Sequence, residues 1–140
     1  MTSLDEAFDR ACRRYSGSNF DQLDEVDKVL VTIWSLEGDV NNGGFDQYYF
    51  NSSGDLAFYA PIALRNIGAH HMAKITEDVN KLFGPQGPAR NRDERKAELL
   101  TIVPNDSESN PWDKHDRAFC SYPDDISTLL ITFLQAHGRI

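Results

Sequence analysis

The chain has 140 residues, 40% of them hydrophobic, and a formal net charge of −8 from 14 basic and 22 acidic residues. This length and composition suit one globular domain and argue against disorder. The acidic balance argues against direct binding to nucleic acid or an anionic membrane, and no stretch approaches the ~20 apolar residues of a membrane span.

The acidic excess is concentrated near the N-terminus. Residues 1–60 hold 4 basic and 11 acidic side chains, whereas residues 61–120 hold 9 of each. Such a surface would attract a basic protein, although a net charge of this size also serves simply to keep a small domain soluble. Met1–Glu6 contains no apolar run, so no secretion signal is expected and a cytoplasmic location follows as the default.

The spacing of apolar residues predicts an all-α fold, a compact single-domain bundle of about six to seven helices with two or three of them short. A capping box formed by Ser3 and Glu6 begins the first helix, which ends before Asn19. The second helix is predicted from residue 21 to about residue 40. Its run Val29–Trp34 is rich in β-branched residues and would suit a buried strand, but the helical period extends over more residues than strands usually have.

Further helical segments follow the second helix. They are predicted at Phe45–Asn51, Leu56–Ile67, Ala69–Phe83, Arg92–Ile102 and Trp112–Phe119, and from Pro123 to about His137. Pro61 fits its helix if it lies in the first turn, and Pro123 is expected at the first helical position with Asp124 and Asp125 in the turn that follows. Arg90–Lys96 forms a basic patch, and Pro104–Asn110 is predicted to be a polar loop.

The most unusual stretch is Asn41–Asn51, which begins with the sequence NNGGFDQY. Gly43 is expected to end the second helix in a left-handed conformation, and Gly44 to allow close approach of another segment. Phe45 and Phe50 are assigned to the core. The polar-tipped Tyr48, Tyr49 and Tyr59 fit either a core or a binding surface, because tyrosine is common in both.

No pattern of catalytic or metal-binding residues emerges. Nucleotide-binding loops and nucleophile elbows are absent, and Cys12 and Cys120 form no metal pattern and are expected to be buried free thiols. His70 and His71 diverge by about 100° on a helix, so they cannot grip one ion together. His115, flanked by Asp113 and Asp116, is interpreted as a solvated histidine. Asp46 is at least as well suited to capping the helix after Gly44 as to acid–base chemistry.

Three segments resemble a known family. Glu37–Asp55, which contains NNGGFDQY, is similar to a bacterial all-helical family of unknown function that includes a DNA-mimic protein from Neisseria; Ala63–Ala73 and Trp112–Phe119 resemble later parts of that family, so the similarity spans about residues 23–137. The resemblance implies a compact helical domain and, for one member, mimicry of the negative surface of DNA. A mimic must hold carboxylates in rows on a rigid surface, because duplex DNA carries one charge per about 1.7 Å of axis.

We therefore expect residues 1–140 to form one helical domain that acts as a non-enzymatic, acidic interaction module, with the basic surface of a DNA-binding protein as its partner. The expected partner-binding carboxylates are Asp21, Asp24, Glu25, Glu37, Asp39, Asp46 and Asp55. The motif residues, expected to be mainly structural, are Asn41, Asn42, Gly43, Gly44, Phe45, Gln47 and Tyr48. No cofactor and no metal site are predicted.

Two alternatives remain open at this point. One is a small-molecule or enzyme pocket at the NNGGFDQY corner, built from Asn41, Asn42, Asp46, Gln47 and Tyr48. The other is a homodimer with a mainly structural purpose.

Overall fold

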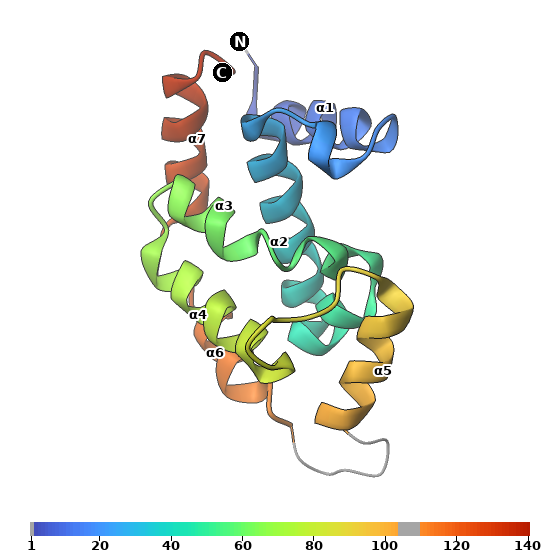
Figure 1. Cartoon of the computed structure of the whole chain (residues 1–140). Helices are drawn as coiled ribbons and strands as arrows, with labels where there is room; N and C mark the ends of the chain where they lie inside the picture. The colour runs from blue at the N-terminus through green and yellow to red at the C-terminus, as the bar shows by residue number, and fades with distance from the viewer. Residues whose placement is uncertain (1, 104–109) are drawn as a thin grey trace.

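The computed structural model describes residues 2–103 and 110–140, and every regular element in those two ranges is helical, which confirms the predicted all-α class. The predicted polar loop at Pro104–Asn110 lies almost entirely outside them. In chain order the elements are α1 (Leu4–Ser16), η1 (Phe20–Gln22), α2 (Glu25–Phe50), η2 (Ser52–Leu56), α3 (Ala60–Asn66), α4 (His70–Asn80), η3 (Lys81–Phe83), α5 (Arg92–Ile102), α6 (Asp113–Cys120) and α7 (Ile126–Ala136). Both termini lie at the same end of the molecule (Figure 1).

Helix α2 runs through the centre of the bundle, and α1, α3, α5 and α6 all contact it (Figure 1). Residues 29–33 are buried on every side of the helix, with exposed fractions of 1% or less. Burial on every side explains why four of these five residues are apolar, since this part of α2 is a core helix surrounded by other helices. The prediction of a helix at Val29–Trp34 is therefore confirmed, and the alternative of a buried strand is wrong.

The corner is a kink inside α2. Gly43 has φ −148° and ψ 15°, and Gly44 has φ 76° and ψ −175°. The expectation of a left-handed Gly43 is therefore wrong by one position, because Gly44 alone of the two has a positive φ. The short helix predicted from Phe45 exists, as the second part of α2 after this kink.

Helix beginnings were predicted with mixed success. The Ser3 cap is confirmed, since Ser3 Oγ accepts a hydrogen bond from the N–H of Glu6. Helix α2 begins at Glu25 rather than at residue 21, because Asp24 caps it by accepting from the N–H of Asp27. Helix α3 begins at Ala60 rather than Leu56, because the residues before it form η2, and Pro61 lies in its first turn as expected.

The prediction for Pro123 is wrong. Helix α7 begins at Ile126, with Asp125 as its N-cap accepting from the N–H of Thr128. Asp124 instead accepts a 2.8 Å hydrogen bond from the N–H of Met72 in the first turn of α4. One carboxylate of the pair therefore caps its own helix, and the other joins that helix to α4.

Two expectations about burial are also wrong. Phe50 is 49% exposed, with the ammonium of Lys96 4.7 Å from its ring centroid, whereas Phe45 is fully buried as predicted. Cys12 is half-buried and Cys120 is exposed, so neither is a core thiol, and both are free. Within the described ranges no helix is both long and apolar enough to cross a membrane.

Candidate interaction surface

The seven predicted carboxylates do not form one cluster, because α2 carries Glu25 near its beginning and Asp46 after its kink. Three of the seven are paired with arginines. Asp21 lies 3.5 Å from Arg90 and Asp24 pairs with Arg139. The Asp55 Oδ1 atom lies 2.9 Å from Nη2 of Arg95, an ion-pair contact outside hydrogen-bond geometry. These three charges are therefore largely compensated within the chain.

Three other predicted carboxylates are held by uncharged donors. Glu25 accepts hydrogen bonds from the Tyr59 hydroxyl and the Asn66 amide. Glu37 accepts from the Tyr122 hydroxyl at 2.6 Å. These neutral partners fix the position of each carboxylate without cancelling its charge.

Asp39 has the same kind of environment at the corner. Its Oδ1 atom accepts from the Gln47 amide at 2.7 Å and from the Asn51 amide at 3.3 Å. Asp46, the seventh predicted carboxylate, is exposed and makes no hydrogen bond or ion pair within the described residues. Glu25 and Asp39 are separated by about 21 Å along the helix axis, given a rise of about 1.5 Å per residue. Glu25, Glu37 and Asp39, which we call the neutral-donor carboxylates, thus all lie on α2, with Glu37 and Asp39 pointing to different sides of the helix because they are two positions apart.

The motif residues form hydrogen bonds that stabilise the corner. Asn42 donates to Oε1 of Gln47 at 3.0 Å, and Gln47 in turn donates to Asp39. Tyr48 is buried, and its hydroxyl has no partner within the described residues. Of the residues proposed for a small-molecule pocket, Asn42 and Gln47 therefore bond to each other inside the corner.

Asp116 of α6 occupies the role that the sequence suggested for Asp46. Its Oδ1 atom accepts a 2.8 Å hydrogen bond from the N–H of Phe45, the first residue after the kink. Burial raises the pKa of Asp116; the Phe45 N–H opposes this shift, while the charges of Asp113 and Asp46 add to it. The sequence provided no signal for this contact, because Asp116 and Phe45 are far apart in the chain.

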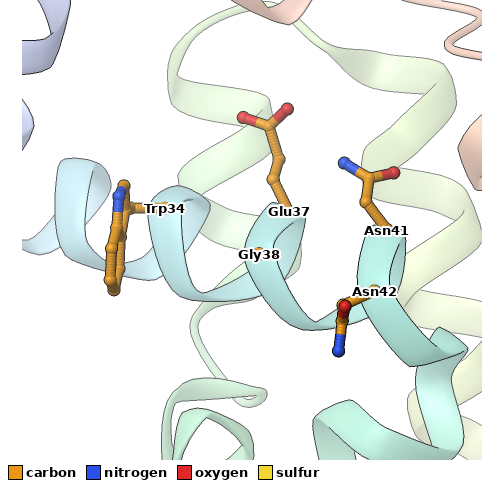
Figure 2. A pocket seen from close by; sticks show the side chains of 5 residues that line it. All are labelled: Trp34, Glu37, Gly38, Asn41 and Asn42. Atoms are coloured by element: carbon orange, nitrogen blue, oxygen red, sulfur yellow. The ribbon is translucent and has the colours of Figure 1, made fainter.

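A hollow of about 450 Å³ lies on the exposed face of α2, lined by Trp34, Glu37, Gly38, Asn41 and Asn42. We call it the α2 depression. Figure 2 shows Glu37 and Asn41 pointing to one side of the helix, with Gly38 between Trp34 and Asn42. Residues 34, 38 and 42 are each four apart, so they share one stripe of the helix surface, and the missing side chain at Gly38 leaves a gap in it.

Trp34 and Gly38 have no structural explanation within the fold. Trp34 is 53% exposed, although the residues before it belong to the core. A Cβ atom added at Gly38 would meet nothing within 4 Å, so packing does not require glycine there. A glycine inside a helix costs about 0.5–1 kcal/mol relative to alanine. Trp34 lies outside the apolar period of the helix, and that displacement was a signal available in the sequence.

Tyr122 forms hydrogen bonds with two residues that line the α2 depression. Its backbone has φ 51°, an uncommon conformation for a tyrosine. Its hydroxyl accepts from the Asn41 amide at 2.7 Å and donates to Glu37. Burial raises the pKa of Tyr122 to about 12; the Asn41 amide opposes the shift, and the hydrogen bond to Glu37 and its charge contribute to it. Burial also raises the pKa of Glu37, which the Tyr122 hydroxyl opposes.

The surface just described belongs to a chain with a recognisable family. The family model described as DMP19-like protein matches residues 21–137, most of the chain. The chain belongs to the DMP19-like family. The region of resemblance expected from the sequence, residues 23–137, lies within the matched range.

The DMP19-like match covers α2 with its kink, the neutral-donor carboxylates and the α2 depression. No curated protein matches the chain significantly. No solved structure does so either. Within the described residues, no group of three or more histidine, cysteine, aspartate or glutamate side chains is placed to hold a metal ion.

Proposed function

We propose that this DMP19-like protein is a non-enzymatic interaction module that uses fixed carboxylates to occupy the DNA-binding surface of a basic protein. The observation that carries the proposal is the neutral-donor carboxylates, Glu25, Glu37 and Asp39. Each has a hydrogen-bonded position and no arginine or lysine partner in the described part of the chain.

Fixed, uncompensated charges are what a substitute for DNA requires. The phosphates of a duplex have set positions, and basic residues of a DNA-binding protein are arranged to meet them. A carboxylate already held by neighbouring side chains loses little conformational freedom on binding, which favours affinity. The family resemblance, which implies DNA mimicry for one member, and the net charge of −8 support the same reading.

The alternative of a small-molecule site at the corner has less support. Gln47 bonds to both Asn42 and Asp39, and Tyr48 is buried. The two amides are therefore engaged within the corner, and burial removes Tyr48 from the surface. Of the five residues expected to form that pocket, only Asn41 and Asn42 line the α2 depression.

The test is capture of a partner and its displacement by DNA. The immobilised chain is incubated with host lysate at about 50 mM and about 200 mM salt, with and without competing duplex DNA, and the bound protein is identified and purified. An electrostatic partner should bind at the lower salt concentration, weaken steeply at the higher one, and be displaced by DNA. A captured protein that DNA does not displace would refute DNA mimicry, and failure to capture any basic protein at low salt would refute the proposed function.

The dependence of partner binding on charge is tested by replacing each carboxylate with the amide of the same size, which keeps one acceptor oxygen. The triple variant Glu25→Gln, Glu37→Gln, Asp39→Asn should reduce partner affinity at least about tenfold, since long-range charge attraction is lost. The control is the triple variant Asp78→Asn, Asp93→Asn, Glu94→Gln, which removes the same charge from α4 and α5. Equal losses in the two variants would mean that net charge alone governs binding.

A further inference from the structure

We propose that the α2 depression seats one arginine side chain of the basic partner, with its guanidinium stacked on the Trp34 ring and paired with the Glu37 carboxylate. This inference rests on the proposed function, because it takes the partner to be a basic protein. It names the residue type that the partner contributes and the place where that residue binds.

The residues that line the α2 depression include an aromatic ring and a carboxylate, both of which suit a cation. An exposed tryptophan ring is the best aromatic surface for a cation, and arginine, being planar, stacks on it more effectively than lysine. Trp34 is 53% exposed and lines the depression together with Glu37. The two residues are three positions apart on α2, so their side chains are neighbours on the helix surface. In Figure 2 the Glu37 carboxylate points away from the side on which the Trp34 ring lies, so a cation that reaches both groups would have to lie over the helix surface beside Gly38.

The fold already orients the Glu37 carboxylate through the Tyr122 hydroxyl. Its Oε2 atom is held by the Tyr122 hydroxyl at 2.6 Å, while Oε1 has no hydrogen-bond partner among the described residues. Tyr122 reaches this position from a backbone with φ 51°, and such uncommon conformations gather at functional sites. One oxygen is therefore fixed by the fold, and the other remains available to a donor from outside.

Gly38 leaves free space on the surface of α2 beside Trp34. It lies between Trp34 and Asn42 on one stripe of α2, and open space extends from the point where its side chain would begin. A side chain at this position would fill the gap beside the Trp34 ring. Glycine lowers helix stability here without any packing advantage inside the chain, which is expected if an outside group must approach the helix backbone.

A second copy of the chain is a less suitable occupant. The chain has a net charge of −8, and a twofold contact across Gly38 would bring Glu37 of one copy close to Glu37 of the other. Like charges placed together across an interface oppose association. Self-association through this face therefore serves as a contrary outcome of the experiment.

The experiment measures binding of short fluorescent peptides to the full chain. One peptide carries two arginines separated by glycine and serine; the others carry lysine or the uncharged arginine analogue citrulline at the same positions. We expect the arginine peptide to bind at least about fivefold more tightly than the lysine peptide, and the citrulline peptide not to bind measurably. Equal binding of the arginine and lysine peptides would overturn the proposal.

Variants then locate the peptide. Gly38→Leu fills the gap and points into open space, so it should leave the melting temperature unchanged or higher while weakening the arginine peptide at least about tenfold. Trp34→Leu and Glu37→Gln should each weaken it as well. Asp78→Asn, which removes a charge from α4, should have no comparable effect. Unchanged peptide affinity in Gly38→Leu would refute the assigned position.

Two outcomes separate this inference from the proposed function. If Gly38→Leu still captures the basic partner as well as the unaltered chain does, the proposed arginine-binding site in the α2 depression is refuted while the proposed function stands. If the unaltered chain captures no basic partner, the proposed function itself fails. Light scattering gives the molar mass of the unaltered chain and of Gly38→Leu. A difference between the two would assign the α2 depression to self-association and refute the proposed arginine-binding site.

Discussion

The backbone N–H of Phe45 donates a 2.8 Å hydrogen bond to the carboxylate of Asp116, although 71 positions separate the two residues. The bond satisfies the first donor of the helical segment that begins after the kink, so Asp116 caps that segment from a different helix. Gly44 makes the approach feasible, because a Cβ atom there would lie 2.5 Å from Oδ2 of Asp116. The glycine and the carboxylate therefore depend on each other.

We expect Gly44→Ala to lower the free energy of unfolding by about 3 kcal/mol. The backbone at this position, with φ 76° and ψ −175°, lies in a region that costs a residue with a side chain about 1–3 kcal/mol, and the new Cβ would also displace the Asp116 carboxylate. Denaturant unfolding measures the effect. Gly38→Ala is the matched control in the same helix, and it should stabilise the protein by about 0.5–1 kcal/mol. A neutral Gly44→Ala would contradict the role of the kink.

The cap itself is tested at Asp116. Asp116→Ala removes the acceptor for the Phe45 N–H and should cost about 1–2 kcal/mol of unfolding free energy. Asp116→Asn retains an acceptor oxygen and should cost less. Amide exchange at Phe45, followed by NMR, should speed up in Asp116→Ala and remain slower in Asp116→Asn; equal exchange rates would show that the cap does not protect this amide.

Local features of the fold were predictable from the sequence. The Ser3 cap and the bounds of α5, Arg92–Ile102, agree with the prediction, because caps and helical periods depend on residues only a few positions apart. The continuation of α2 through its kink was less accessible. It depends on the conformation of Gly44 and on Asp116, which the fold brings from a distant segment.

Long-range polar contacts account for most of what the sequence did not reveal. Arg95 was assigned to a basic patch, but it is fully buried. The partner-binding role of Glu25, Glu37 and Asp39 stays a prediction, and their neutral hydrogen-bond partners, which come from other segments or from beyond the kink, were not predicted. Trp34 and Gly38 were candidates in principle, since one leaves the apolar period and the other interrupts a core helix. Only the structure places them in one depression.

Arg95 joins α5 to the end of α2. Its guanidinium donates to the carbonyl oxygens of Tyr49, Asn51, Ala89 and Arg90, at 2.6 to 3.0 Å. We expect Arg95→Met to lower the free energy of unfolding by about 3–5 kcal/mol, because buried carbonyls and the Asp55 carboxylate lose their partner. Arg95→Lys should also be destabilising, since lysine cannot reproduce the planar fork.

The control for Arg95 is Arg117→Ala, in the exposed pair with Asp113. That pair should contribute no more than about 0.5 kcal/mol. Denaturant unfolding measures the effects of Arg95→Met and Arg117→Ala, since a shift in the midpoint with an unchanged m-value reports a change in stability. If Arg95→Met were no more destabilising than Arg117→Ala, the buried network would not stabilise the fold as described.

The final prediction concerns the dependence of stability on pH. Burial alone would raise the pKa of Asp124, but hydrogen bonds from the Met72 N–H and from His71 outweigh it, so the pKa is lowered in the folded state. A lowered folded pKa means that the stabilisation is fully present above the unfolded value of about 3.9 and is lost as the pH falls through the folded value. Asp124→Asn should lower the free energy of unfolding by about 1–2 kcal/mol at neutral pH. The difference in unfolding free energy between this variant and the unaltered chain should become smaller in acid.

Asp116 supplies a control of opposite sign for this pH dependence. Its folded pKa is raised, chiefly by burial, so its protonated form is favoured in the folded state and its contribution to stability declines as the pH rises through the folded value. Unfolding free energies measured between about pH 3 and pH 7 for the unaltered chain, Asp124→Asn and Asp116→Asn give both differences. The stability advantage of the unaltered chain should grow with pH relative to Asp124→Asn and shrink relative to Asp116→Asn. Parallel trends in the two variants would contradict these assignments.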